Sequence, residues 1–107
     1  MNVALYARTA CPDRYAIDCQ LKSLNAFAEE HNLDVVDVAK ECGSGIRADR
    51  PELIRVESLA ADGKIDAIVV TDISRLFRDT FLYRDFAERM ESYGVKIFML
   101  DRLQRLL

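Results

Sequence analysis

Short apolar runs recur along the chain at intervals that leave room for a helix between them. They are rich in Val, Ile and Ala and carry few charges inside, which is typical of strands buried on both faces. These runs predict four strands, over residues 2–8, 33–39, 65–71 and 95–100.

The segments between these runs place apolar residues at helical spacing. They predict helices over 16–30, from 49 to a stop at Gly63, and over 79–93, while residues after 101 could start another. The expected packing faces are Ile17, Leu21, Leu24, Phe27 and Ala28 in the first helix, Leu53, Ile54, Val56, Leu59 and Ala60 in the second, and Leu82, Phe86 and Met90 in the third.

This strand–helix alternation favours right-handed crossovers and a parallel sheet. We therefore expect one α/β domain over residues 1–107, a three-layer sandwich with a mainly parallel sheet of four to five strands flanked by helices. In such a sheet the loops that follow the strands gather at one edge, where ligands bind.

Composition narrows the class of protein. The chain carries a net charge of −3, which argues against a free-standing, non-specific nucleic-acid binder. No apolar run has the ~20 residues of a membrane span, and the start leaves no room for a signal peptide. The cysteines, Cys11, Cys19 and Cys42, lack the spacing of a zinc site. We expect reduced thiols in the cytoplasm, no membrane contact and no bound metal.

Several arginines follow predicted strands. Arg8 ends the first apolar run, Arg75 and Arg78 follow the third, and Arg47 and Arg50 lie where the second helix starts. Guanidinium groups that converge on one edge favour phosphate, because their planar fork donates two parallel hydrogen bonds. A solvated first helical turn would equally explain Arg75 and Arg78 taken alone.

Three further features concern the edge of the sheet where the strands end, which we call the rim. Gln20 lies near the start of the first helix, where a solvated residue is expected unless that start faces the rim. Asp49 can cap the second helix, and Glu52 can complete a capping box. The run Gly43-Ser44-Gly45 is not a Walker loop, because no Gly-Lys-Ser/Thr ending follows it.

Five short motifs occur in one order along the chain. They are Tyr6-Ala7-Arg8-Thr9-Ala10, Ile17-Asp18-Cys19-Gln20, Gly43-Ser44-Gly45 with Asp49-Arg50-Pro51-Glu52-Leu53, Gly63-Lys64-Ile65-Asp66, and Arg75-Leu76-Phe77-Arg78-Asp79-Thr80. With this motif order the chain resembles, over nearly its whole length, the catalytic domain of the serine recombinases, the resolvase/invertase family. Each motif is weak alone, and the five in register are specific together.

The resemblance implies cleavage of DNA by a serine that forms a 5′-phosphoseryl link, followed by strand exchange in a tetramer without a cofactor. It implies phosphate-binding roles for Arg8, Arg50, Arg75 and Arg78 and a site role for Gln20. It also implies that the family's long dimer-forming helix and DNA-binding region lie beyond Leu107, so that DNA and further copies of the chain are the expected partners.

The sequence departs from the family at the nucleophile, two residues after Arg8, where it has Ala10. A methyl group cannot attack phosphorus, so the chain as given is expected to be inactive. Thr9 and Cys11 are the neighbouring candidates for rescue, although a shift of one residue turns Thr9 to the other face of its strand. Ser74 replaces a common aspartate, with Asp72 two residues earlier, and this combination also occurs in branches of the family.

Three classes of function remain open. The first is a site-specific recombinase catalytic domain, either inactivated at Ala10 or a fragment of an active type. The second is a non-catalytic relative acting in dimerisation or DNA-associated regulation. The third is a phospho-acceptor receiver, which needs acidic residues after its first strand to hold magnesium. Arg8 occupies that place, so the receiver is disfavoured.

Overall fold

The computed structural model describes residues 1–10, 12–43 and 50–105, with side chains up to residue 102. Its sheet has the order β2-β1-β3-β4, and all three strand pairs are parallel. The strands are β1 (Asn2–Thr9), β2 (Asp34–Cys42), β3 (Ala67–Val70) and β4 (Lys96–Met99). The expected parallel α/β sandwich is confirmed, with four strands in the described part of the chain.

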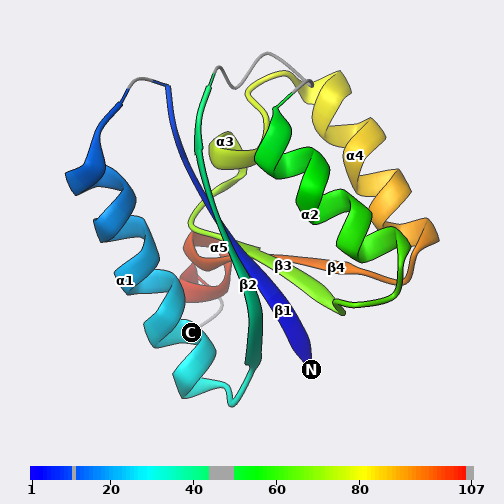
Figure 1. The fold of residues 1–107 in the computed structure, drawn as a ribbon, viewed down its shortest axis with the longest axis horizontal. Helices are drawn as coiled ribbons and strands as arrows, with labels where there is room; N and C mark the ends of the chain where they lie inside the picture. The colour runs from blue at the N-terminus through cyan, green and yellow to red at the C-terminus, as the bar shows by residue number, and fades with distance from the viewer. Residues whose placement is uncertain (11, 44–49, 106–107) are drawn as a thin grey trace.

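Helices cover both faces of this sheet (Figure 1). The two faces are occupied by α1 (Arg14–Glu30) with α5 (Leu100–Arg105), and by α2 (Pro51–Ala61) with α4 (Thr80–Ser92). A short helix, α3 (Ile73–Leu76), lies between β3 and α4 on the second face. No helix in the described ranges has the length and apolar character needed to cross a membrane.

The central strand β1 divides the core into two clusters. Ala4 and Tyr6 pack with α2 and α4, whereas Val3, Leu5 and Ala7 pack with α1. This alternation is the period of two that a strand imposes on its side chains. Leu24 of α1 and Phe86 of α4 are fully buried, so two of the predicted packing faces lie where the periodicity placed them.

Short polar residues lie at the ends of several helices. Asp13 accepts a hydrogen bond from the main-chain N–H of Ala16 at 3.0 Å, and Asp79 does the same for Phe81 and Leu82 of α4. Asn32 follows α1 with φ 55°, a left-handed conformation that asparagine tolerates at the end of a helix. The expected cap Asp49 lies outside the described residues.

Two expectations about the second strand and helix are wrong. The second strand is predicted to end at residue 39, but β2 continues through Glu41 and Cys42 because Arg8 and Thr9 of β1 extend the pairing. Ile54 was expected in the packing face of α2, but it is 51% exposed. The neighbouring Leu53 and Val56 already fill the contact with the sheet, and Ile54 lies outside the arc they define.

Candidate functional site

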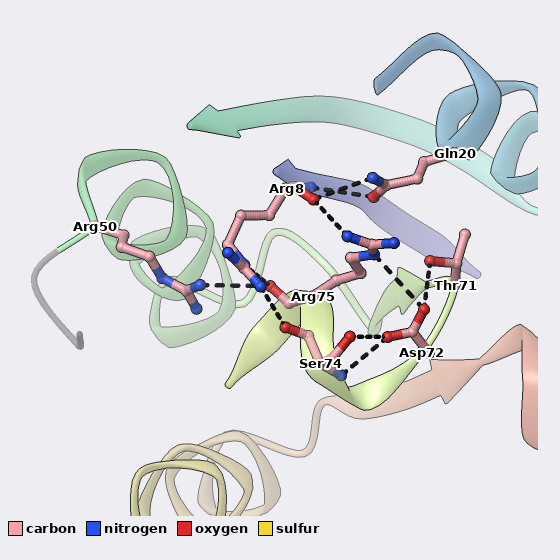
Figure 2. Close-up of polar contacts among 7 residues, drawn as sticks. All are labelled: Arg8, Gln20, Arg50, Thr71, Asp72, Ser74 and Arg75. Atoms are coloured by element: carbon pink, nitrogen blue, oxygen red, sulfur yellow. Dashed lines mark hydrogen bonds and ion pairs between the residues drawn. The ribbon is translucent and has the colours of Figure 1, made fainter. Parts of the chain in front are cut away.

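The candidate site lies where β1, β2 and β3 end, at the carboxyl edge of the sheet. Four of the arginine and glutamine residues named from the sequence meet there: Arg8 from β1, Gln20 from α1, Arg50 before α2 and Arg75 from α3 (Figure 2). The parallel topology accounts for this convergence, because it places the loops after all three strands on one side.

Arg8 is almost completely buried, at 1% exposure of the residue, and its guanidinium donates to three main-chain carbonyls. Nε donates to Arg75 at 3.0 Å, Nη1 to Gly43 at 2.6 Å and Nη2 to Ser74 at 2.6 Å. Burial, and then the nearby charge of Arg50, lowers the pKa of Arg8 below its ordinary value. Arg8 therefore joins the ends of β1, β2 and α3.

The side chain of Gln20 holds the main chain of Arg8 from the other side. Its Oε1 accepts from the N–H of Arg8 at 3.1 Å, and its Nε2 donates to the carbonyl of Arg8 at 3.0 Å. Gln20 is only 6% exposed, so the start of α1 does face the rim and the residue is not solvated. This pair of bonds fixes α1 against the end of β1.

Arg50 lies under the same rim with 3% exposure. Nη1 donates to the carbonyl of Arg75 at 3.4 Å, and Nη2 donates to the carbonyl of Leu76. Its guanidinium carbon lies 4.7 Å from the centre of the Phe77 ring, a cation–π contact. Burial lowers the pKa of Arg50. Arg50 and Arg8 together thus neutralise the carbonyl end of α3.

Arg75 is the more accessible arginine of the cluster. Nη1 donates to the carbonyl of Arg8 at 3.1 Å, and Nε faces Oδ2 of Asp72 at 3.6 Å. The side chain is 31% exposed, in contrast to those of Arg8 and Arg50. Part of this guanidinium is therefore open to solvent at the rim.

Arg78 is exposed and lies beside a cavity of about 300 Å³ between α3 and α4. The cavity is also lined by Ile73, Ser74, Phe77 and Tyr83. Arg78 is close enough to lower the pKa of Arg8 by its charge, so it belongs to the same electrostatic site although it stands outside the hydrogen-bonded cluster of Figure 2.

Glu41 is a buried acid near this cluster that sequence reasoning missed. Its carboxylate accepts from the hydroxyl of Tyr6 at 2.8 Å and from the main-chain N–H groups of Glu52 and Leu53 at 2.9 and 3.0 Å. It therefore caps α2 from a neighbouring strand, and fixes the helix start next to Arg50. The only signal in the sequence was an acidic residue two positions before Gly43, which does not by itself predict burial.

Ala10 is exposed and follows the last residue of β1. Thr9, one of the two rescue candidates, is 6% exposed and takes the strand phase of Leu5 and Ala7, on the face away from Arg8. The other candidate, Cys11, lies outside the described residues, as do Ser44, Gly45 and Arg47. The described geometry thus offers no hydroxyl nucleophile from Thr9.

The cluster is strongly cationic and is suited to an anion. Within the described ranges no group of three or more His, Cys, Asp or Glu side chains gathers as metal ligands. Fixed guanidinium groups are the alternative means of stabilising charge on a phosphoryl group.

Known proteins resemble this chain in sequence and in fold. Residues 3–105 match the family model "Resolvase, N terminal domain". The protein "Putative resolvase L103" of Acanthamoeba polyphaga mimivirus is 37% identical over 73 residues, which cover 66% of this chain. The matched stretch covers only 38% of that relative's length.

Solved structures agree with this assignment. The C-terminal catalytic domain of ISC1926 TnpA, an IS607-like serine recombinase, superposes with a TM-score of 0.88 at 26% identity, covering 94% of this chain and 70% of that one. The corresponding domain of IS1535 TnpA, also an IS607-like serine recombinase, gives 0.77 at 33% identity, over 91% and 69%. The chain therefore belongs to the resolvase N-terminal domain family, and it has the fold of a serine recombinase catalytic domain.

Proposed function

We propose that this chain is the phosphoryl-transfer domain of a site-specific DNA recombinase, with its anion site formed by Arg75 and Arg78 and supported by Arg8, Gln20 and Arg50. The observation that carries this proposal is the position of Arg75. Its partly open guanidinium is hydrogen-bonded to the carbonyl of Arg8, two residues before Ala10. A phosphodiester bound at Arg75 would therefore lie beside the end of β1.

The chemistry of this domain needs a serine nucleophile at position 10, where this chain has Ala10. With a serine at position 10, Oγ would attack phosphorus and displace the 3′ oxygen, leaving the 5′ phosphate on the protein. The arginines would stabilise the negative charge that builds up on the phosphoryl oxygens, where losing one such donor costs about 10²–10³ in rate. With Ala10, the attack cannot occur, so we propose that the chain as given binds the phosphate without cutting.

The proposal also covers the target of the protein, its oligomeric state and its cellular compartment. The expected target is duplex DNA in the cytoplasm, engaged mainly through a DNA-binding region outside these 107 residues, by a protein acting as a dimer or tetramer. The net charge of −3 supports this division of labour, because a domain that is acidic overall gains little affinity for duplex DNA from diffuse attraction.

A non-catalytic role in dimerisation or DNA-associated regulation is the second candidate, and Ala10 favours it. A protein that no longer needed to cut DNA would have no use for the hydroxyl while keeping the fold. Selection on catalysis having ended, its rim residues would also be free to change. The fold itself needs the buried residues Arg8, Gln20 and Arg50. Yet the accessible arginines Arg75 and Arg78 are present as well, which supports the catalytic ancestry of the site.

The deciding experiment restores the hydroxyl. Ala10→Ser in the full-length gene product, incubated with labelled duplexes tiled across the DNA on either side of its gene, should give a covalent adduct on a denaturing gel. Ala10 is exposed, so the added oxygen needs no repacking. The unaltered chain and Ala10→Ser with Arg75→Ala serve as matched controls, and neither should form the adduct.

Absence of an adduct, with DNA binding and folding of the Ala10→Ser variant both confirmed, would contradict the catalytic proposal. The non-catalytic reading would then account for the chain. A covalent product from the unaltered chain would instead show that another residue acts as the nucleophile.

A further inference from the structure

Asp72 lies between β3 and α3, and its two carboxylate oxygens have different partners. Oδ1 accepts from the main-chain N–H of Ser74 at 3.0 Å and also from the Ser74 hydroxyl. Oδ2 accepts from the Thr71 hydroxyl at 3.2 Å and faces Nε of Arg75 at 3.6 Å (Figure 2). One oxygen caps the helix, and the other faces the accessible arginine of the site.

The contact between Asp72 and Arg75 acts through charge. A separation of 3.6 Å is longer than a good hydrogen bond, and Nε of Arg75 is buried without a hydrogen-bond acceptor among the described residues. Each of the two side chains is 31% exposed, so water screens their attraction only in part. The ion pair therefore directs the Nε edge of Arg75 away from the open rim.

Two contacts then fix the plane of the Arg75 guanidinium. Nη1 is held by the carbonyl of Arg8, and the Nε edge is held by Asp72. We propose that Asp72 is a positioning residue that uses its charge to orient Arg75 for the phosphoryl group and to lower the affinity of the site for anions in their ground state. This inference rests on the anion site of the proposed function.

Orienting Arg75 and weakening the binding of ground-state anions would both favour the transition state of phosphoryl transfer. A phosphodiester carries one negative charge, and charge builds up further as the nucleophile adds. A site whose cation is already balanced by a carboxylate holds the ground state weakly, while Arg75 stays in place for the more highly charged state. Interactions that strengthen only as charge develops are the ones that accelerate a reaction.

Two substitutions separate the cap from the charge. Asp72→Asn keeps a side-chain oxygen for the cap of α3 and removes the charge. Asp72→Glu keeps the charge on a longer stem and gives up the cap geometry. Asp79→Asn is the matched control, because Asp79 caps α4 in the same way and its loss changes the net charge equally.

The first measurement is the order of the Arg75 Nε–H group, from ¹⁵N relaxation of the arginine side chains in the 107-residue chain without ligand. Asp72→Asn should lower the order parameter of Arg75 alone, whereas Asp79→Asn should leave it unchanged and Asp72→Glu should restore part of it. An unchanged Arg75 signal in Asp72→Asn would overturn the positioning role, whatever the phosphate result.

The second measurement is the dissociation constant for inorganic phosphate, from amide shifts of the same proteins. Removing the competing carboxylate should tighten phosphate binding in Asp72→Asn about twofold to fivefold, the range expected of a partly exposed ion pair. Asp79→Asn should change it less. Equally tighter phosphate binding in both variants would show a general effect of net charge. That result would overturn the proposal that Asp72 lowers the affinity of the site for anions.

The two measurements also separate the inference from the proposed function. A loss of Arg75 order in Asp72→Asn, with no phosphate shifts near Arg75 in any variant, would contradict the anion site and leave only the orientation of Arg75 by Asp72. In Asp72→Asn we expect both results together: a more mobile Arg75 side chain and tighter phosphate binding. A merely structural lesion would weaken binding as it loosened the side chain.

Discussion

Arg8 and Arg75 hold each other by reciprocal contacts, each guanidinium donating to the main-chain carbonyl of the other. Nε of Arg8 lies 3.0 Å from the oxygen of Arg75, and Nη1 of Arg75 lies 3.1 Å from the oxygen of Arg8. The pair joins the end of β1 to α3 across the rim of the sheet. Arg8 is buried by this arrangement and Arg75 is not, so the two arginines contribute differently to stability and to binding.

Substitution of Arg8 should mainly lower stability. Arg8→Ala removes three donors from carbonyls at the rim and leaves a void, so the free energy of unfolding should fall by about 3–5 kcal/mol. Urea unfolding followed by circular dichroism measures the change. Arg78→Ala is the control at an exposed position, and its effect should stay within about 0.5 kcal/mol. Equal effects of the two substitutions would contradict the structural role of Arg8.

Substitution of the accessible arginines should mainly weaken anion binding. Arg75→Ala and Arg78→Ala should each reduce phosphate affinity by about 1–3 kcal/mol, the range for losing a charged hydrogen bond. Titration with inorganic phosphate, followed by amide shifts, gives the dissociation constants. Arg89→Ala is the control, since Arg89 pairs with Glu57 on the α2–α4 surface. Shifts confined to amides far from Ala10 and Arg75 would count against the site.

Glu41 should contribute more to the free energy of unfolding than an acidic residue at the surface does. Glu41→Gln places an amide group where two main-chain N–H groups and the Tyr6 hydroxyl now donate, which should cost about 1–3 kcal/mol. The control is Asp37→Asn on the same strand, where Asp37 pairs with the partly exposed Arg55. That loss should cost at most about 1 kcal/mol. Thermal or urea unfolding of both variants tests the difference, and a costlier Asp37→Asn would refute it.

Stability should fall in alkaline solution through Tyr6. Burial, and to a lesser degree the hydrogen bond to Glu41, raises the pKa of Tyr6 well above its ordinary value, although the charge of Arg50 opposes the shift. The unfolded chain then loses this proton near pH 10 while the folded chain keeps it, so the free energy of unfolding is unaffected below that pH and decreases above it. Tyr6→Phe should show a shallower decrease between pH 9.5 and about 11. Identical slopes for the two proteins would contradict the assignment.

The layers of the fold could be predicted from periodicity because strand and helix patterns are local. Residues 2–8 and 16–30 carry these patterns in full, and the structure places β1 and α1 over nearly the same residues. The short helix α3 was missed because its four residues are too few to show the apolar spacing of a helix. Its formation depends on the Asp72 cap and on carbonyl acceptors that Arg8 and Arg50 satisfy from other segments.

The sequence could predict which residues belong to the candidate site, but not how their side chains are arranged. Arg8, Arg50 and Arg75 could be named from their places after strands and before helices. The burial of Arg8 and Arg50 against carbonyls depends on contacts between residues far apart in sequence, which no local pattern carries. The same reason explains why the sequence left Gln20 open between solvent and rim, and why Glu41 falls outside the predicted second strand.

The bonds between Arg8 and α3 also bear on how the chain reaches its fold. They join residues 66 or 67 apart, and β1 pairs with β3 across a similar separation. Closing so long a loop carries an entropic cost before any contact compensates it, so such pairings form slowly. During synthesis, the first strand leaves the ribosome well before the segment that buries Arg8. The cationic rim is therefore completed only when residues 74–76 arrive, and a nascent chain that ends before them has Ala10 but no cluster of arginines around it.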